Sequence, residues 1–192
     1  MMNKARGKKA LILDMRGNGG GAEETLLRLI GNFFDRDIKV GDIKRRNETK
    51  PLVAKSRGGD IFNGKLVVLV DSASGSAAEV FARVVQLEKR GTVIGDRSAG
   101  AVMRSRAYVH SVGPDSAIFY GASITDADLV MTDGKSLEQT GVVPDKLMIP
   151  GGVHLATGRD PVLAYAAGIL EVPLDAGKAG ALFPFVWYDD IP

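Results

Sequence analysis

Two short apolar runs, each followed by a turn and an amphipathic segment, constrain the fold of this chain most strongly. Residues 10–13 and 66–70 are continuously apolar, which is the pattern of a strand buried on both faces. Apolar residues recur at helical spacing over 26–34 behind the first run, and a second helix is predicted over 77–89 behind the second. A third short strand is predicted over 92–95. Strands that alternate with helices indicate an α/β domain with a largely parallel sheet.

Further segments add to this α/β core. Residues 38–59 are polar and basic with no sustained period, which predicts an excursion on the surface, with a hairpin as one possible form. Residues 104–131 contain alternating stretches, so the fold is expected to carry a β-rich C-terminal portion. A short helix is predicted over 161–170, with Asp160 as its N-cap. The aromatic tail at 183–188 is expected to pack on the core or on a neighbouring subunit.

The overall composition excludes several classes of protein. The 192 residues are enough for one domain, and Lys+Arg 25 against Asp+Glu 23 leaves a net charge of +2, so no nucleic-acid partner is expected. The absence of cysteine excludes a thiol nucleophile and a thiolate metal site. No apolar run approaches the roughly 20 residues that span a bilayer, so no membrane insertion is expected. The basic residues 1–9 lead into an apolar run too short for a signal peptide, and the sequence assigns no compartment.

The turn after the first strand has three explanations. Gly17, Gly19 and Ala22 satisfy the dinucleotide-binding fingerprint, and Asp42 lies at about the right distance for a ribose contact. Residues 14–16 separate the strand from the first glycine, however, whereas a nucleotide-binding turn must be tight. The second explanation is a purely structural turn. The third is that its glycine amides point into a site and form an oxyanion hole, because glycine lets the backbone approach a ligand closely.

Residues 71–79 (DSASGSAAE) follow the second strand and open the second helix. Ser76 is expected at the N-terminus of that helix, where free amides and the positive end of the helix dipole favour a developing oxyanion. The same residues form a capping box, in which Ser76 caps the helix and Glu79 reaches back to the backbone. Taken alone, this motif favours the helix cap over the nucleophile.

Four segments, in their order and approximate separation, resemble the catalytic core of the S41 family of serine proteases. The matching segments are residues 11–21 (LILDMRGNGGG), 75–79 (GSAAE), 93–100 (VIGDRSAG) and 138–145 (EQTGVVPD). The family comprises the C-terminal processing, or tail-specific, proteases and the related tricorn-type proteases. The resemblance extends from Ala10 to about Leu170. It implies a ClpP/crotonase-like α/β spiral and a single catalytic core over residues 1–192.

The resemblance implies a role for each matched position. Ser76 is the expected nucleophile, and the backbone N–H groups of Ala77 and Gly20 are the expected oxyanion hole. The implied reaction is hydrolysis of a peptide or protein substrate through an acyl-enzyme on Ser76. No metal or cofactor is implied, and a homo-oligomer is one possible assembly.

This chain differs from the best-known branch of the family at the position of the general base. Processing proteases carry a lysine directly after the glycine that ends the third segment, and this chain has Ala101 there. Arg97 cannot replace it, because a guanidinium stays protonated. Tricorn-type proteases instead use a histidine from a segment before the first core strand and a glutamate, to which Glu138 corresponds. His110 and His154 are expected to be ordinary strand-face or loop residues.

The sequence therefore predicts a serine endopeptidase core that lacks an N-terminal segment and any PDZ-like domain, and that is weak or inactive alone. Its expected catalytic residues are Ser76 and Glu138, with the base supplied from outside the chain. The first alternative is a non-catalytic peptide-binding or scaffold relative that has lost its base. The second alternative is a dinucleotide-binding oxidoreductase, based on the glycine turn.

Overall fold

The computed structural model describes residues 2–113 and 118–183. Its elements, in chain order, are α1 Met2–Ala5, β1 Ala10–Asp14, α2 Glu23–Ile30, β2 Ile38–Arg45, β3 Glu48–Ala54, β4 Lys65–Val70, α3 Ala77–Leu87, β5 Thr92–Gly95, β6 Arg104–Val112, β7 Ile118–Met131, β8 Lys146–Leu147, α4 Gly152–Ala156, α5 Pro161–Ile169 and α6 Ala176–Leu182. Within these ranges, none of the helices combines the length and apolar character needed to cross a membrane.

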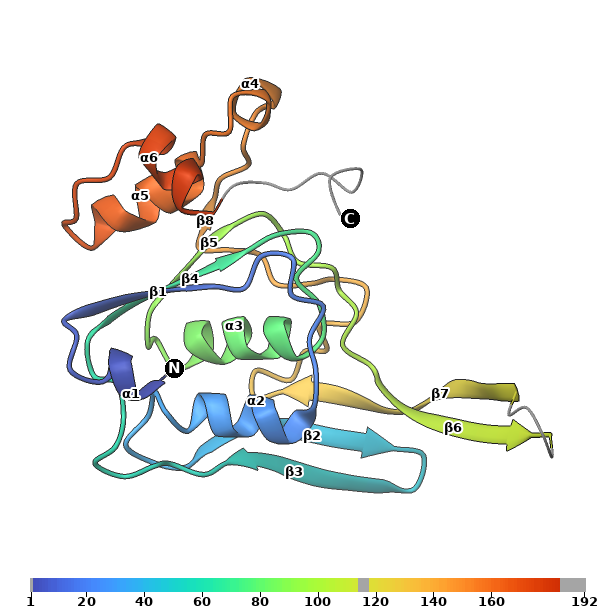
Figure 1. The fold of residues 1–192 in the computed structure, drawn as a ribbon. Coiled ribbons are helices and arrows are strands. Elements are labelled where there is room, and N and C mark those ends of the chain that lie inside the picture. The colour runs from blue at the N-terminus through green and yellow to red at the C-terminus, as the bar shows by residue number, and fades with distance from the viewer. Residues whose placement is uncertain (1, 114–117, 184–192) are drawn as a thin grey trace.

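These elements form layers (Figure 1). Helices α2 and α3 lie between a parallel sheet of order β1-β4-β5-β8 and an antiparallel sheet of order β3-β2-β7-β6. Helices α5 and α6 cover the other face of the parallel sheet. The predicted fold class is confirmed, because a parallel α/β core is joined to a β-rich portion.

Strand β4 lies between two hydrophobic cores. Alternate side chains of a strand point to opposite faces of the sheet. Leu66, Val68 and Val70 belong to the core around α2 and α3, whereas Val67 and Leu69 pack toward α5 and α6. The predicted strand that is buried on both faces is confirmed here, and it gives a rigid support to the residues that follow it.

Strand β1 and the residues after α2 differ from the prediction. β1 pairs with β4 in parallel, but it lies at the edge of its sheet, so residues 10–13 are half-buried rather than buried on both faces. Helix α2 ends at Ile30, and Phe33 and Phe34 enter the core from the turn behind it. The apolar spacing over 26–34 therefore combines helix and turn residues.

The segment 38–59 is more than a surface excursion. It forms the hairpin of β2 and β3, and it contributes buried side chains such as Ile38 and Val40 to the main core. A register shift between Lys39 and Gly41 interrupts the alternation of buried and exposed side chains. This irregularity is the physical reason why the sequence shows no sustained period.

Strands β6 and β7 extend from the body as a two-stranded ribbon (Figure 1). β7 pairs with β2 only over residues 128–131, and side chains are exposed along the whole of β6. The predicted β-structure over 104–131 is confirmed in the described part. The predicted packing of the tail concerns residues 184–188 beyond Phe183, which lie outside the described residues.

Candidate active site

Ser76 occupies the junction between β4 and α3, at the N-cap position of the helix. Its backbone angles are φ 50° and ψ −119°. A residue with a side chain is strained at such a positive φ, and backbone strain of this kind concentrates at functional sites. The start of α3 has the arrangement of a capping box, in which the Glu79 side chain accepts the Ser76 N–H, but no hydrogen bond of normal geometry joins the Ser76 hydroxyl to the helix.

The structure separates the three serines of this loop. Ser74 is fully buried, and its hydroxyl donates to the carbonyl oxygen of Met15 at 2.9 Å, which makes it a structural residue. Ser72 lines a cavity on one side of the loop, and half-buried Ser76 lines a different cavity next to the glycine turn. Of the three, Ser76 combines an accessible side chain with a strained backbone.

The glycine turn lies directly against Ser76. A Cβ added at Gly20 would lie 2.6 Å from the Ser76 Cβ and 3.0 Å from the Ala77 nitrogen. Gly20 also has φ +106°, so both its conformation and its surroundings require glycine. The N–H of Gly75 donates to the carbonyl oxygen of Asn18 at 2.9 Å and ties the two loops together.

The two predicted oxyanion donors differ in their hydrogen bonds. Ala77 is the first residue of α3, and among the described residues no acceptor occupies its N–H. The N–H of Gly20 donates to the side-chain oxygen of Asn18 at 2.9 Å. The fold brings both residues next to Ser76, and it leaves the Ala77 N–H free while an internal acceptor holds the Gly20 N–H.

Glu79 is a buried carboxylate with a wider role than the capping motif indicates. It is 0% exposed, and its Oε2 accepts the Ser76 N–H at 2.8 Å, as the motif predicts. The same carboxylate accepts the Gly100 N–H at 2.7 Å, the Ala101 N–H at 3.0 Å and the Ser98 hydroxyl at 2.6 Å. A buried charge needs such partners to remain favourable. Glu79 thereby fixes the backbone of Ser76 relative to the segment that contains Ala101.

We expect Glu79→Gln to lower the free energy of unfolding by about 2–4 kcal/mol, because the amide nitrogen of Gln replaces an oxygen that now accepts hydrogen bonds. Urea denaturation followed by circular dichroism measures the change. Glu24→Gln is the matched control. The Glu24 side chain is 75% exposed and pairs with Arg28 on its own helix, so the control should change stability by less than about 0.5 kcal/mol. Equal losses in both variants would contradict the role assigned to Glu79.

Ala101 and Glu138 are both linked to Ser76 through the backbone. The carbonyl oxygen of Ala101 accepts the Ser76 N–H at 3.0 Å. Glu138 Oε2 accepts the N–H groups of Val102 at 2.9 Å and Met103 at 3.0 Å. Glu138 therefore stabilises the segment that continues from Ala101, and its side chain lies outside the lining of the cavity next to Ser76.

Neither histidine lines the cavity next to Ser76. His110 lies on exposed β6 and stacks on Tyr120, with the ring centroids 5.5 Å apart. His154 lies on α4, where its Nδ1 accepts the Gly151 N–H at 3.2 Å. The prediction that His110 is a strand-face residue is confirmed, and His154 is found on a short helix.

The cavity next to Ser76 has a volume of about 350 Å³ and is bounded by elements of the helix layer and the antiparallel sheet. Its buried apolar lining residues are Leu26, Ile43, Leu52, Val80, Val102 and Leu129. Gly21 of the glycine turn and Ser76 and Ala77 at the start of α3 also line it. The Ser76 side chain therefore lies at a recess in the surface.

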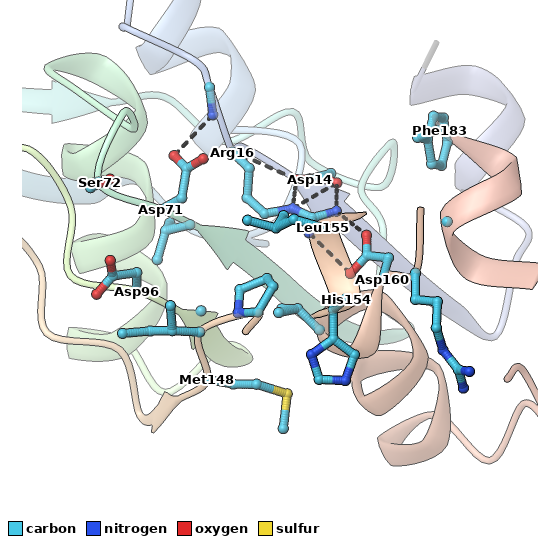
Figure 2. A pocket seen from close by; sticks show the side chains of 18 of the residues that line it. Asp14, Arg16, Asp71, Ser72, Asp96, Met148, His154, Leu155, Asp160 and Phe183 are labelled. Carbon is cyan, nitrogen blue, oxygen red and sulfur yellow. Dashed lines mark hydrogen bonds and ion pairs between the residues drawn. The ribbon is translucent and has the colours of Figure 1, made fainter. Parts of the chain in front are cut away.

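A second cavity, of about 520 Å³, lies at the carboxyl ends of β1, β4 and β5 (Figure 2). Arg16 Nη2 lies 2.6 Å from Asp14 Oδ2 and 2.7 Å from Asp160 Oδ2. Asp71 Oδ1 accepts the Gly17 N–H at 2.9 Å. Figure 2 shows how these contacts join the start of the glycine turn to α5.

Asp160 has two roles in this network. It caps α5 as predicted, since its Oδ1 accepts the Leu163 N–H at 2.9 Å. Burial raises the pKa of Asp160, but hydrogen bonds from Arg16 and Leu163 outweigh burial and hold the pKa below its ordinary value. Burial lowers the pKa of Arg16, and the contacts with Asp14 and Asp160 more than compensate, so this pKa is raised. The ion pair therefore persists at neutral pH and anchors α5.

Asp160→Asn removes this charge and keeps a good N-cap residue, so we expect a loss of about 1–2 kcal/mol in the free energy of unfolding at pH 7. A carboxylate whose pKa is lower in the folded state than in the unfolded state stabilises the folded protein at pH values above its ordinary pKa. This contribution is lost as the pH falls through the folded-state pKa. Urea titrations at pH 7, 5 and 3 should therefore show the difference between wild type and variant closing at the acid end. Asp175→Asn, at the exposed N-cap of α6, is the control with the smaller loss. A difference that widens toward acid pH would contradict this account.

The topology does not support the dinucleotide alternative. That fingerprint needs its acidic residue at the end of a neighbouring parallel strand. Asp42 instead lies on β2 in the antiparallel sheet and pairs with Lys39 at 2.9 Å. In the ranges that the structure describes, no group of three or more His, Cys, Asp or Glu residues is placed to hold a metal ion.

Comparison with known proteins agrees with this geometry. The model of peptidase family S41 matches residues 1–148. A carboxy-terminal-processing protease from Bartonella bacilliformis is 26% identical over 190 residues, which cover 95% of this chain and 42% of that protein. The solved photosystem II D1 C-terminal processing protease is 26% identical with a TM-score of 0.59, over 77% of this chain and 36% of that chain. The crystal structure of the tricorn protease shares the fold over 84% of this chain and 15% of that chain, with 23% identity and a TM-score of 0.57.

The matches cover most of this chain but less than half of each curated relative. The chain spans 27%, 28% and 42% of the lengths of three curated relatives, so it corresponds to one part of those proteins. The family match, in contrast, extends over most of this chain and includes both Ser76 and Glu138. The chain belongs to peptidase family S41.

Proposed function

We propose that this chain is the catalytic core of a serine endopeptidase with Ser76 as its nucleophile. The Ser76 oxygen attacks a peptide carbonyl, the C–N bond breaks, and a general base transfers the hydroxyl proton to the leaving amine. Water then hydrolyses the acyl-enzyme. The Ala77 N–H and, after it releases Asn18, the Gly20 N–H stabilise the tetrahedral oxyanion, and each such donor typically contributes about 3 kcal/mol.

One juxtaposition supports this proposal above all others. The strained Ser76 lies between the glycine turn and a cavity, and the N–H of the next residue, Ala77, has no acceptor among the described residues. A serine that merely capped its helix would use its hydroxyl on the first turn. The observed arrangement suits a hydroxyl that adds to a carbonyl and a backbone donor that receives the resulting charge.

We place the general base outside the described residues. Glu23 and Asp128 line the cavity, but Glu23 pairs with Arg104 at 3.3 Å and Asp128 accepts the Ser136 hydroxyl at 2.7 Å. A histidine from another part of a longer protease would complete a Ser/His/Glu mechanism, in which Glu138 orients the site through the backbone of Val102 and Met103. The limited coverage of the curated relatives supports such a longer protein, with an N-terminal segment and any PDZ-like domain beyond this chain.

A second candidate function is a peptide-binding module without catalysis. The observation that favours it is Ala101, which stands where processing proteases carry their lysine. Such a relative would keep the cavity and the glycine turn, bind peptides, and form no acyl-enzyme.

A serine-directed acylating probe distinguishes the two functions. Applied to the full-length protein, it is expected to add its mass to the peptide that contains Ser76, as measured by mass spectrometry after digestion. Ser72→Ala should label as well as the wild type, because Ser72 faces the other cavity. Peptide binding without any adduct on Ser76 would reject the protease proposal in favour of the binding module.

A further inference from the structure

Strand β6 forms a free edge of the antiparallel sheet. It is the last strand in the order β3-β2-β7-β6, and among the described residues its backbone pairs with β7 alone. Every residue from Arg104 to Val112 is exposed. A free edge of this length presents a row of unpaired N–H and C=O groups, which can pair with a strand of another chain.

The opposite edge of the same sheet is protected against such pairing. Strand β3 carries Pro51 and Lys50, and Lys50 Nζ lies 2.6 Å from Glu48 Oε1. Proline and charged side chains on an edge oppose the addition of another strand. Strand β6 contains neither proline nor lysine, and one of its two arginines, Arg104, is already paired with Glu23 at 3.3 Å. The protection of this sheet is therefore one-sided.

The ribbon of β6 and β7 has little support within its own chain (Figure 1). β7 pairs with β2 only over residues 128–131, so residues 105–112 and 118–125 form two strands with no third strand beside them in the described part of the chain. An isolated two-stranded ribbon is marginally stable in water, whereas three or more strands with an apolar face are stable. Many exposed side chains of the ribbon are nevertheless apolar, and they include Val109, Val112, Ile118, Phe119, Tyr120 and Ile124.

The charges of β6 are compatible with pairing to a second copy of this chain. Two identical strands related by a two-fold axis between them pair in an antiparallel manner. An axis at Val109 places Arg106 of one copy opposite Val112 of the other, because these residues lie three positions before and three positions after the axis. Arg104 then lies beyond the paired residues 106–112. Like charges opposite each other destabilise a strand pair, and this register avoids them, whereas an axis at Arg106 would bring two arginines together.

The same register extends a row of aromatic side chains across the contact. Residues that face each other in antiparallel strands have their side chains on one face of the sheet. Within each copy His110 faces Tyr120 and stacks on it, with the ring centroids 5.5 Å apart. With the axis at Val109, Tyr108 of the second copy faces His110 from its other side. Three rings then form one row on a four-stranded sheet.

We infer that β6 is a dimerisation strand, through which two copies of this chain form a continuous four-stranded sheet in the order β7-β6-β6-β7 with the two-fold axis at Val109. Backbone hydrogen bonds along residues 106–112 make the contact. The partner is a second copy of the same chain. This inference does not depend on the proposed function, because no step of it uses Ser76.

Lysine substitutions on the edge strand and on the inner strand test this contact. Val109→Lys in the full-length protein places two lysines opposite each other at the axis, so we expect the dissociation constant of the dimer to rise at least about tenfold. Phe119→Lys is the matched control. Phe119 is 73% exposed, compared with 69% for Val109, and it lies on the same face of the ribbon but on the inner strand β7.

Sedimentation equilibrium measures the dissociation constant of each variant. The control should change it by no more than about twofold, as is usual for an exposed residue away from a contact. Equal losses in both variants would mean that the ribbons pack face to face, which would overturn the inference. A wild-type protein that stays monomeric at about 100 μM would also overturn it.

Cysteine substitutions locate the axis, because this chain contains no cysteine of its own. In an antiparallel pair the residue on the axis lies about 4.5–5.5 Å from its counterpart, within the Cα separation of a disulfide. Residues two positions from the axis lie at least about 13 Å from theirs. Val109→Cys is therefore expected to give a covalent dimer under mild oxidation, as measured by non-reducing electrophoresis, whereas Ala107→Cys and Ser111→Cys should give little. Similar yields at all three positions, or none at any of them, would overturn the inference.

Comparison of the isolated chain with the full-length protein tests a different occupant of the edge. The chain spans 42% of one curated relative, so a longer protein contains other segments that could cover β6. The covalent dimer of Val109→Cys is expected both in the chain of 192 residues and in the full-length protein. A covalent dimer of the isolated chain alone would mean that another segment covers β6, and this result would overturn the inference.

Discussion

Ser76→Ala is expected to reduce peptide hydrolysis by the full-length enzyme by a factor of about 10⁶ in kcat, the loss typical when a serine nucleophile is removed. The reason is chemical, because alanine has no oxygen with which to form the acyl-enzyme. The change also removes the adduct formed by a serine-directed probe. Steady-state kinetics on a peptide substrate and mass spectrometry of the labelled protein measure the two effects.

The control for this prediction is another serine of the same loop. Ser72→Ala should keep kcat within about twofold, because Ser72 lines the cavity at the carboxyl ends of the strands rather than the one next to Ser76. Circular dichroism should show both variants folded, since no hydrogen bond that supports the core involves either hydroxyl in the part of the chain that the structure describes. A Ser76→Ala enzyme that retains more than a few per cent of its turnover would remove Ser76 from the mechanism.

The position of Ser76 could be predicted from the sequence because every step to it is local. The apolar run at 66–70 specifies a buried strand, and the residues after it specify a turn and a helix start. Which of the loop serines faces a cavity depends on tertiary packing. The buried hydrogen bond of Ser74 to Met15 joins residues 59 positions apart, and no local pattern indicates it.

The role of Glu79 shows how a correct local signal can be incomplete. Its spacing from Ser76 predicts the backbone contact that the structure contains. Its other partners, Ser98, Gly100 and Ala101, lie 19 to 22 residues further along the chain and meet it only when β5 pairs with β4. One sequence signal does point to these partners. Glu79 lies among the inward apolar positions of its helix, and a buried acidic side chain requires hydrogen-bond donors around it.

Long-range pairing also explains the network around Arg16. Sequence reasoning predicted Asp160 as a helix cap, and this is confirmed. Its ion pair with Arg16 joins residues 144 positions apart and depends on how α5 docks on the parallel sheet. Long-range packing also hid the cavity next to Ser76, because its walls come from the helix layer and from the antiparallel sheet, which are far apart in the sequence.

The most informative gain of function concerns Ala101. Its carbonyl oxygen accepts the Ser76 N–H at 3.0 Å, and its side chain is exposed, so a longer side chain at this position starts beside Ser76 without entering the core. The resemblance to processing proteases places a lysine here. A neutral lysine is a competent general base for a serine hydroxyl, whereas the alanine of this chain offers none.

Ala101→Lys in this chain of 192 residues is therefore expected to raise the rate of Ser76 acylation by an activated ester about 10²-fold, the lower end of what a positioned general base contributes. Lysine acts as a base only when neutral, so below its ordinary pKa of about 10.4 the rate should rise with pH. A stopped-flow measurement of ester release from pH 6 to pH 10 gives both the size of the effect and its sign.

Ala101→Arg is the matched control, because arginine adds a similar length and charge but stays protonated over this whole range. It should acylate no faster than the wild-type chain, and its rate should lack the added rise with pH. Double replacement with Ser76→Ala should abolish the gain, since the lysine then has no hydroxyl to deprotonate. A lysine variant that behaves like the arginine variant would mean that position 101 does not direct its side chain to the nucleophile. A gain that survives Ser76→Ala would mean that the added amine itself attacks the ester.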